Sequence, residues 1–247
     1  MEKTRKQIII KLGRSIVTND DNSLNKKLFT HLAHEIKELQ KKDFGVILVV
    51  SGAVVSGKKM LTDQINTLHK GLLAGIGQIS LSCEIHDVFS KEYLVTGQML
   101  LTKDDLKNYN KRKQLKEISK EAIDHNIVLV FNENDAIELG TFSGNDFLAA
   151  SLAKVIHASH VVLLTDVEGV FDKDMHVLAS LKKSELRNIA HIKKENDKGQ
   201  IGGMKAKIQA AFDARKYGAS CIIAHGKTPR ILTKLFIENK KVGTEII

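Results

Sequence analysis

Six short apolar runs recur along the chain, and stretches with helical spacing of apolar residues lie between them. The runs are continuous rather than alternating, which is typical of buried strands, and they cover residues 7–12, 46–50, 93–102, 127–131, 160–166 and 220–226. The helical stretches cover residues 24–39, 66–91, 104–125, 147–158 and 204–218, and Pro229 is expected at the first position of a last helix. This alternation predicts an α/β fold with a mainly parallel sheet that helices cover on both faces.

The 247 residues have the length of one large α/β domain or two small ones. No linker rich in proline, glycine or serine divides the chain, and no internal repeat is visible. The lysine-rich stretch 191–203 is interpreted as a mobile loop rather than a domain boundary. We therefore expect a single domain over residues 1–247.

Polar clusters follow nearly every predicted strand. They are Lys11, Ser51, Thr96-Gly97, Asn132–Asp135 and Thr165-Asp166. Ligands of parallel α/β sheets collect at the carboxyl ends of the strands, so five clusters placed there indicate one composite site. A second polar cluster, Gly144-Asn145-Asp146, comes shortly after Asn132–Asp135. A turn or a helix cap would explain either of these two clusters singly.

Three glycine-containing segments have the character of anion-binding loops. SGAVVSGKKM contains Gly52, Gly57 and Lys58 in the order of a P-loop, but Lys59 stands where a P-loop needs serine or threonine to bind Mg²⁺. A P-loop fold is therefore not expected, although a strand, a glycine loop and a helix in succession still form an anion cradle. KLGRS and GQIGGMKAK also place lysines beside glycines.

Composition excludes several classes of protein. The formal charge is +9, but the lysines are spread along helical segments and no aromatic residues alternate with them, so nucleic-acid binding is not expected. No run reaches the ~20 apolar residues of a membrane helix, and no signal peptide is visible. Cys83 and Cys221 lack metal-binding spacing and are expected to be reduced, packed thiols of a cytoplasmic protein.

The motifs KLGRS, VVSGAVVSG, GQMLLT, NENDA, GND, LLTDVEGVF and GGMKAK occur in the order and spacing of the amino-acid kinase family. The chain resembles this family over nearly its whole length, and GQMLLT with NENDA is typical of its glutamate 5-kinase branch. The resemblance implies a three-layer α/β/α sandwich that uses ATP and Mg²⁺ to phosphorylate the γ-carboxylate of L-glutamate, the first step of proline synthesis. It also implies a homodimer or homotetramer, inhibition by proline, and a chain that ends where the kinase domain ends, without the C-terminal PUA domain of many members.

The resemblance also assigns roles to residues at matching positions. The implied catalytic residues are Lys11, Lys207 and Asp146, with both lysines at the transferring phosphoryl group and Asp146 holding them. The implied glutamate-binding residues are Ser51, Gly52, Ala53, Asn134, Asp135 and Asn145. The implied ATP-binding residues are Lys11, Gly13, Thr165, Asp166, Gly202, Gly203, Met204, Lys205 and Lys207. No residue is assigned as a metal ligand.

Gly144 is the main departure from the family pattern, which usually reads GDND where this chain reads SGND. An acidic residue associated with glutamate binding is thus replaced, and Asp135 or Glu138 could compensate. Two alternatives follow. The acceptor could be another small carboxylate, such as an N-acylated amino acid that has no ammonium group, or the chain could be a non-catalytic sensor of nucleotides or amino acids. The retained Lys11, Asp146 and Lys207 favour an enzyme.

Overall fold

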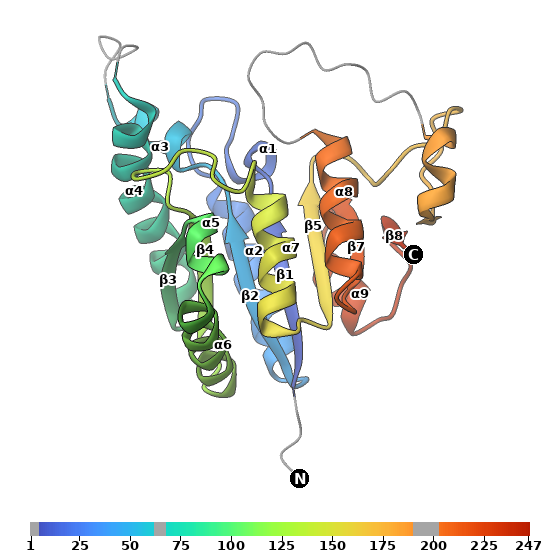
Figure 1. Cartoon of the computed structure of the whole chain (residues 1–247), viewed down its shortest axis with the longest axis horizontal. Coiled ribbons are helices and arrows are strands. Elements are labelled where there is room, and N and C mark those ends of the chain that lie inside the picture. Colours follow the sequence, from blue (N-terminus) through green and yellow to red (C-terminus); the bar gives the residue numbers. More distant parts are fainter. Residues whose placement is uncertain (1–4, 62–67, 190–202) are drawn as a thin grey trace.

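Strands and helices alternate along the chain in the computed structural model, which describes residues 5–61, 68–189 and 203–247 (Figure 1). The strands are β1 (Lys6–Leu12), β2 (Phe44–Val50), β3 (Thr96–Leu101), β4 (Val128–Glu133), β5 (His160–Thr165), β6 (Ser180–Leu181), β7 (Ser220–His225) and β8 (Thr244–Ile246). The helices are α1 (Arg14–Val17), α2 (Lys26–Gln40), α3 (Ala53–Lys59), α4 (Lys70–Lys91), α5 (Lys103–Lys107), α6 (Tyr109–Asp124), α7 (Asn145–Ile156), the 3-10 helix η2 (Lys183–Asn188), α8 (Met204–Arg215) and α9 (Ile231–Phe236).

The strands form one sheet in the order β3-β4-β2-β1-β5-β7-β8-β6. Its neighbouring strands are parallel except β7 and β8, so the predicted mainly parallel sheet is confirmed. The chain builds the sheet on one side of β1 first and then crosses to β5 on the other side. Ligand crevices form where the strand order reverses in this way, outside the carboxyl ends of the strands. Those ends lie at the top of Figure 1.

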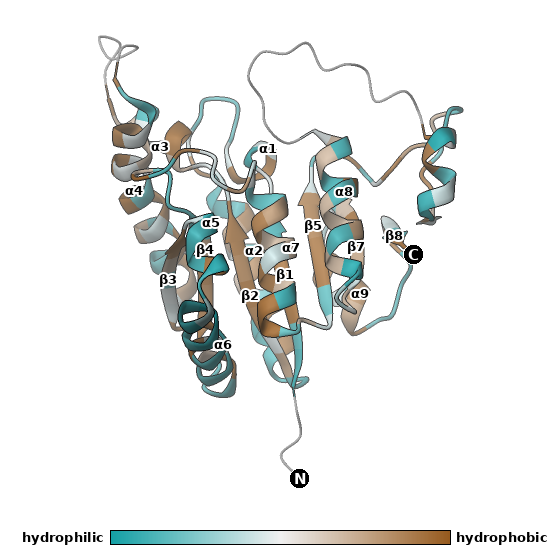
Figure 2. Ribbon diagram, in the orientation of Figure 1, coloured by the Kyte–Doolittle hydropathy of each residue, from teal (hydrophilic) through white to brown (hydrophobic). Residues whose placement is uncertain are grey.

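Helices cover both faces of the sheet because successive strand residues point to opposite sides. Ile9 packs in one buried cluster with α6, α7 and α8, whereas its neighbours Ile8 and Ile10 pack in a second cluster with α2, α4 and α9. Figure 2 shows the result as apolar strands between helices that carry both polar and apolar positions, of which α6 is the most polar. The predicted three-layer α/β/α sandwich is thereby confirmed. Among the described helices, none combines the length and the apolar character that a membrane span requires.

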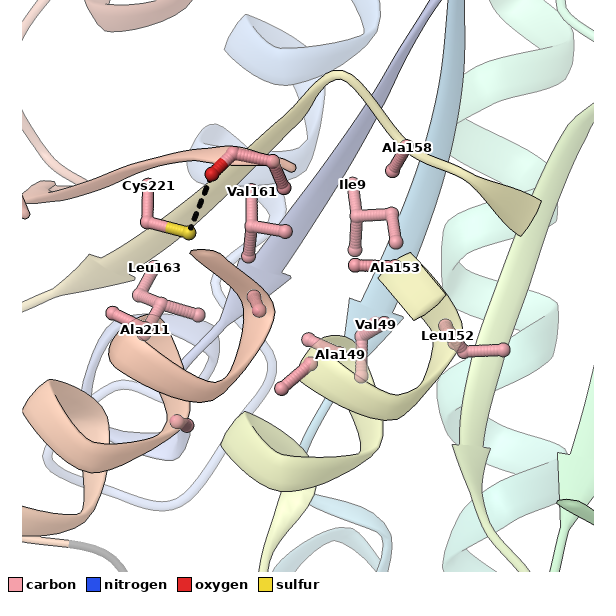
Figure 3. Close-up of a cluster of buried hydrophobic side chains, with 14 of the residues drawn as sticks. Ile9, Val49, Ala149, Leu152, Ala153, Ala158, Val161, Leu163, Ala211 and Cys221 are labelled. Atoms are coloured by element: carbon pink, nitrogen blue, oxygen red, sulfur yellow. Dashed lines mark hydrogen bonds between the residues drawn. The ribbon is translucent and has the colours of Figure 1, made fainter. Parts of the chain in front are cut away.

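Figure 3 shows the cluster beneath α7 and α8, to which Cys221 belongs. Its Sγ lies 3.6 Å from the carbonyl oxygen of Ala219, and burial raises the pKa of the thiol to about 12. Cys221 is therefore the packed thiol that was expected. The same expectation is wrong for Cys83, which is exposed on α4. Cys83 lies one turn after the exposed Ile79, on the face of α4 that points away from the sheet.

Local backbone geometry overrides the hydrophobic pattern at several element boundaries. The helix expected over residues 104–125 is two helices, α5 and α6, because Asn108 leaves the helical region and its side chain caps α6. Pro229 is not the first residue of α9, since Arg230 forms the N-cap after it. Tyr93 has a positive φ and delays the start of β3. The pattern also did not reveal α1, α3, β6 or β8, and the expected loop over residues 191–203 lies almost wholly outside the described residues.

Two glycines allow α3 and α4 to pack with their backbones in contact. A Cβ on Gly57 would overlap the carbonyl oxygen of Leu73, and a Cβ on Gly77 would overlap the carbonyl oxygen of Ala53. Only residues without a side chain fit at both positions. The packing ties the loop after β2, which opens α3, to the longer helix α4.

Candidate active site

A pocket of about 770 Å³ opens at the carboxyl ends of β1, β2, β4 and β5. Polar residues from the end of each strand line it, namely Lys11, Ser51, Asn132, Glu133 and Thr165. Four of the five predicted polar clusters therefore contribute to one site. The prediction is wrong for the fifth, Thr96-Gly97, because these residues begin β3 and lie at the opposite end of the sheet.

Three charged side chains meet at the inner end of the pocket. Lys11 lies near the end of β1, and Asp146 and Lys207 lie in the first turns of α7 and α8. The Nζ of Lys11 is 2.7 Å from Oδ1 of Asp146, and the Nζ of Lys207 is 3.2 Å from Oδ2 of the same carboxylate. The exposed fraction is 4% for Lys11, 3% for Asp146 and 8% for Lys207. One buried carboxylate thus holds two ammonium groups side by side, and the group of three has an excess positive charge that suits an anionic ligand.

Burial lowers the pKa of Lys11, because the ammonium form loses its contact with water. Asp146 opposes this effect, and the nearby ammonium of Lys207 adds to it. The pKa of Lys11 therefore depends on Asp146. Without this carboxylate, the two buried ammonium groups of Lys11 and Lys207 would repel each other. The three residues named as catalytic are therefore brought together as an electrostatic unit.

Asn145 joins three elements on the side of the pocket that holds the predicted glutamate-binding residues Ser51, Gly52, Ala53 and Asp135, here called the acceptor side. Its Nδ2 donates to Oγ of Ser51 at 3.0 Å and to Oδ1 of Asn132 at 2.7 Å. Asn132 in turn donates to Oε1 of Gln78 on α4 at 2.8 Å. The oxygen of the same side-chain amide, Oδ1 of Asn145, is buried and accepts no hydrogen bond within the part of the chain that the structure describes. Since buried acceptors are nearly always bonded, this oxygen suits a donor from a ligand, such as an ammonium group.

Asp135 and Asn134 differ in position although they are adjacent in the sequence. Asp135 lines the pocket, and its Oδ1 accepts the backbone N–H of Gly140 at 3.0 Å. Burial raises the pKa of this carboxyl group. Asn134 is not among the residues that line the pocket, and its backbone N–H bonds to the carbonyl oxygen of Leu101. The structure therefore brings Asp135, but not Asn134, to the acceptor side together with Ser51, Gly52, Ala53 and Asn145.

The other side of the pocket has features that suit an anion. Its lining includes the predicted ATP-binding residues Gly13, Thr165, Asp166, Gly203 and Met204. Neither α7 nor α8 has a side-chain hydrogen bond at its N-cap, so backbone N–H groups and the positive ends of two helix dipoles remain for a ligand at the lysines.

Two further predicted ATP-binding residues are not seen in the pocket. Lys205 is exposed on α8 and does not line it, because it points to a different side of the helix from Lys207. Gly202 lies outside the described residues. Their roles stay predictions.

Several residues that were not assigned roles also line the pocket, among them Arg14, Lys58, Lys70, Asn132 and Glu133. The NENDA motif contains Asn132 and Glu133, and the glycine loop contains Lys58, so both carried a signal in the sequence. Lys70 carried none, because it is brought to the pocket by the packing of α4.

Comparison with known proteins was made for sequence and for structure. The model of the amino acid kinase family matches residues 6–225. Glutamate 5-kinase from Caldanaerobacter subterraneus subsp. tengcongensis is 33% identical, over 98% of this chain and 68% of that protein. Glutamate 5-kinase from Nitrosomonas eutropha is also 33% identical, over 99% and 68%. Glutamate 5-kinase from Alkaliphilus metalliredigens is 30% identical, over 96% and 94%.

Two solved structures share the fold at low sequence identity. UMP kinase from Bacillus anthracis has a TM-score of 0.66 and 17% identity, covering 99% of this chain and 96% of that one. UMP kinase from Ureaplasma parvum has a TM-score of 0.66 and 16% identity, covering 98% and 99%. The sequence matches also identify the branch of the family, which structures at such low identity cannot do. This chain belongs to the amino acid kinase family, and within it to the glutamate 5-kinases.

Proposed function

We propose that this chain transfers the γ-phosphoryl group of ATP to the γ-carboxylate of L-glutamate, giving γ-glutamyl phosphate and ADP, the first step of proline biosynthesis. The observation that carries the proposal is the pair of lysines on Asp146, which lies between an anion-binding side and an acceptor side of one pocket. The names of the relatives support the choice of glutamate.

The acceptor needs no general base. A glutamate side chain has a pKa of ~4.3 and is already ionised at neutral pH, so positioning decides its reactivity. The ammonium group of glutamate would bond to Oδ1 of Asn145 and to Asp135, while backbone N–H groups at Gly52 and Ala53 would hold its α-carboxylate. The γ-carboxylate then points toward Lys11 and Lys207.

Phosphoryl transfer spreads negative charge over the oxygens that the phosphorus carries. The ammonium groups of Lys11 and Lys207 would offset that charge, and the N-terminus of α8 would bind the phosphates of the nucleotide. We expect Mg²⁺ to arrive with ATP as part of the nucleotide substrate. Asp146 does not react in this scheme and keeps both lysines in place.

An acceptor assay tests the function. Purified protein is given ATP and Mg²⁺ with L-glutamate, N-acetyl-L-glutamate, L-aspartate or no acceptor, ADP release is measured, and hydroxylamine traps any acyl phosphate as a hydroxamate. We expect ADP and hydroxamate to form with glutamate at millimolar concentration. Turnover only with another acid would reassign the acceptor, and ATP binding without turnover on any of these acids would indicate a sensor.

Gly144 has a backbone conformation that explains why an acid is missing there. Its φ of 117° and ψ of 152° lie in a region that is almost restricted to glycine. We expect Gly144→Asp to lower the free energy of unfolding by about 1–3 kcal/mol and to leave the KM for glutamate unimproved. Gly144→Ala adds the Cβ without the charge and should show the same loss of stability. A lower KM in Gly144→Asp, with stability retained, would show that the backbone adapts and that the acid binds substrate.

We further propose that the chain forms a homodimer or homotetramer and that proline inhibits it, as the family resemblance implies. The outward face of α4 exposes Leu72 and Ile79, and β3 is the edge strand beside it, so this side offers apolar surface and an open strand to a second copy. Light scattering after size-exclusion chromatography measures the oligomer. Proline added to the acceptor assay at several glutamate concentrations measures the inhibition.

A further inference from the structure

Glu133 is a buried carboxylate at the end of β4, and the scheme above gives it no role. Its exposed fraction is 5%. Its Oε2 accepts the backbone N–H of Phe142 at 3.2 Å, and the backbone of Gly144 is close enough to stabilise the charged form of the carboxylate. A carboxylate that loses its water is costly unless polar groups replace it, and here the backbone groups that do so belong to one loop.

That loop leads directly into the reactive part of the pocket. Gly144 is the N-cap of α7, and the next two residues are Asn145 and Asp146. Contact of Glu133 with the backbone of Gly144 therefore helps to fix the position of the start of α7. It thereby also helps to place the side chains proposed to bind the acceptor and the lysines. The residue before Glu133 acts in the same direction, since Oδ1 of Asn132 accepts from Asn145 at 2.7 Å.

Glu133 also takes part in the charge balance around Lys11. Its carboxylate interacts favourably with the ammonium of Lys11, which Asp146 and Lys207 face from α7 and α8. Burial raises the pKa of Glu133, and the negative charge of Asp135 adds to this effect. The charge of Glu133 thus adds to that of Asp146 in stabilising the ammonium form of Lys11.

We propose that Glu133 is a positioning residue for phosphoryl transfer, which holds the backbone at Phe142 and Gly144 and supports the ammonium of Lys11 with its negative charge. The proposal rests on the proposed function, since it concerns the same pocket. It assigns two separable tasks to one side chain. The contacts with the loop backbone place Asn145 and Asp146, and the charge acts on Lys11.

Glu133→Gln separates the two tasks, because glutamine keeps the shape and an acceptor oxygen but has no charge. We expect kcat to fall about tenfold to a hundredfold, because a small displacement of the groups around the reacting atoms has an effect of this size. The KM for glutamate should change less. Lys11 must be protonated to act, so activity falls as the pH rises through its pKa. Loss of the Glu133 charge lowers that pKa, and the alkaline limb of kcat/KM should move to lower pH.

Glu133→Asp makes the complementary change, because it keeps the charge on a shorter side chain. We expect its alkaline limb to stay in place while the KM for glutamate rises. If Glu133→Gln does not fold, the Glu133→Asp variant tests the proposal by its raised KM and unchanged pH profile. An unchanged KM in Glu133→Asp would overturn the positioning role.

Glu35 supplies a matched control. It is also buried, and its Oε2 accepts the backbone N–H of Thr233 at 2.8 Å, but it does not line the pocket. Glu35→Gln should lower stability and leave the KM and the pH profile unchanged. A Glu133→Gln variant that matches Glu35→Gln in kcat, KM and pH profile would refute the proposal alone. An unsubstituted protein without turnover on any acid would refute the proposed function as well.

Discussion

Lys207→Met is expected to lower kcat by about a thousandfold while the protein stays folded. Methionine nearly matches the length of the lysine side chain, so the buried position stays filled, but the ammonium that lies 3.2 Å from Asp146 is lost. Charge stabilisation in the transition state is usually worth 10²–10³ in kcat per donor, or about 3–4 kcal/mol. The KM for glutamate should change little, because this cation serves the transferring phosphoryl group. Steady-state kinetics on the purified variant, with circular dichroism for folding, measure both quantities.

Lys116→Met provides the control for that variant. Lys116 is exposed on α6, away from the pocket, so the same exchange there should leave kcat unchanged. If Lys207→Met kept a kcat within tenfold of the unsubstituted protein, Lys207 would have no part in the reaction. ATP binding that persists when turnover is lost would place the effect in the chemical step.

Asp146→Asn is expected to lower the free energy of unfolding by about 3–5 kcal/mol, in addition to a loss of turnover. Removing one partner of a buried ion pair leaves the other charge uncompensated, and here Lys11 and Lys207 would both lose their shared carboxylate. Chemical denaturation followed by circular dichroism measures the difference in stability. The slope of the free energy of unfolding against denaturant concentration should stay the same if the substitution affects only the native state.

The stability of Asp146→Asn should also depend on pH in a particular direction. The pKa of Lys11 is already lowered in the folded protein, and loss of Asp146 lowers it further. The unfolded chain then binds more protons than the folded one between the folded pKa and the ordinary lysine pKa of ~10.4, so stability rises with pH across that window. The defect relative to the unsubstituted protein should shrink as the pH is raised through the same range.

Asp213→Asn is the matched control for this substitution. Asp213 pairs with Lys216 at 2.6 Å on the surface of α8, where water screens both charges. Its loss should cost less than about 1 kcal/mol. Equal losses in the two variants would mean that burial adds nothing to the role of Asp146.

Much of this architecture could be predicted from local pattern. Continuous apolar runs marked six of the eight strands, because a strand that is covered on both faces has no polar side to alternate. The same reasoning placed Lys11, Ser51 and Thr165 at strand ends, and the pocket unites them. Where a single residue decides the backbone, as at Asn108 and Tyr93, the pattern failed because apolar spacing carries no information on φ and ψ.

Other features depended on residues that are far apart in the chain. Asp146 meets a lysine 61 residues away, and nothing in either segment alone specifies that pairing. The resemblance to a family supplied the roles of these two residues, whereas Glu133 became a candidate only when its contacts with the loop before α7 were known. Gly144, which reads as a missing acid in the sequence, has a backbone conformation in the structure that favours glycine.

The sequence by itself thus determined six of the eight strands, most of the longer helices, and four of the five strand ends at which polar residues gather. It could do so because burial imposes a period on neighbouring residues. Only the tertiary structure decided the strand order β3-β4-β2-β1-β5-β7-β8-β6, the sharing of Asp146 by two lysines and the place of Glu133 behind them. Those features arise from packing and charge pairing between distant segments, and such contacts leave no periodic trace in the residues that make them.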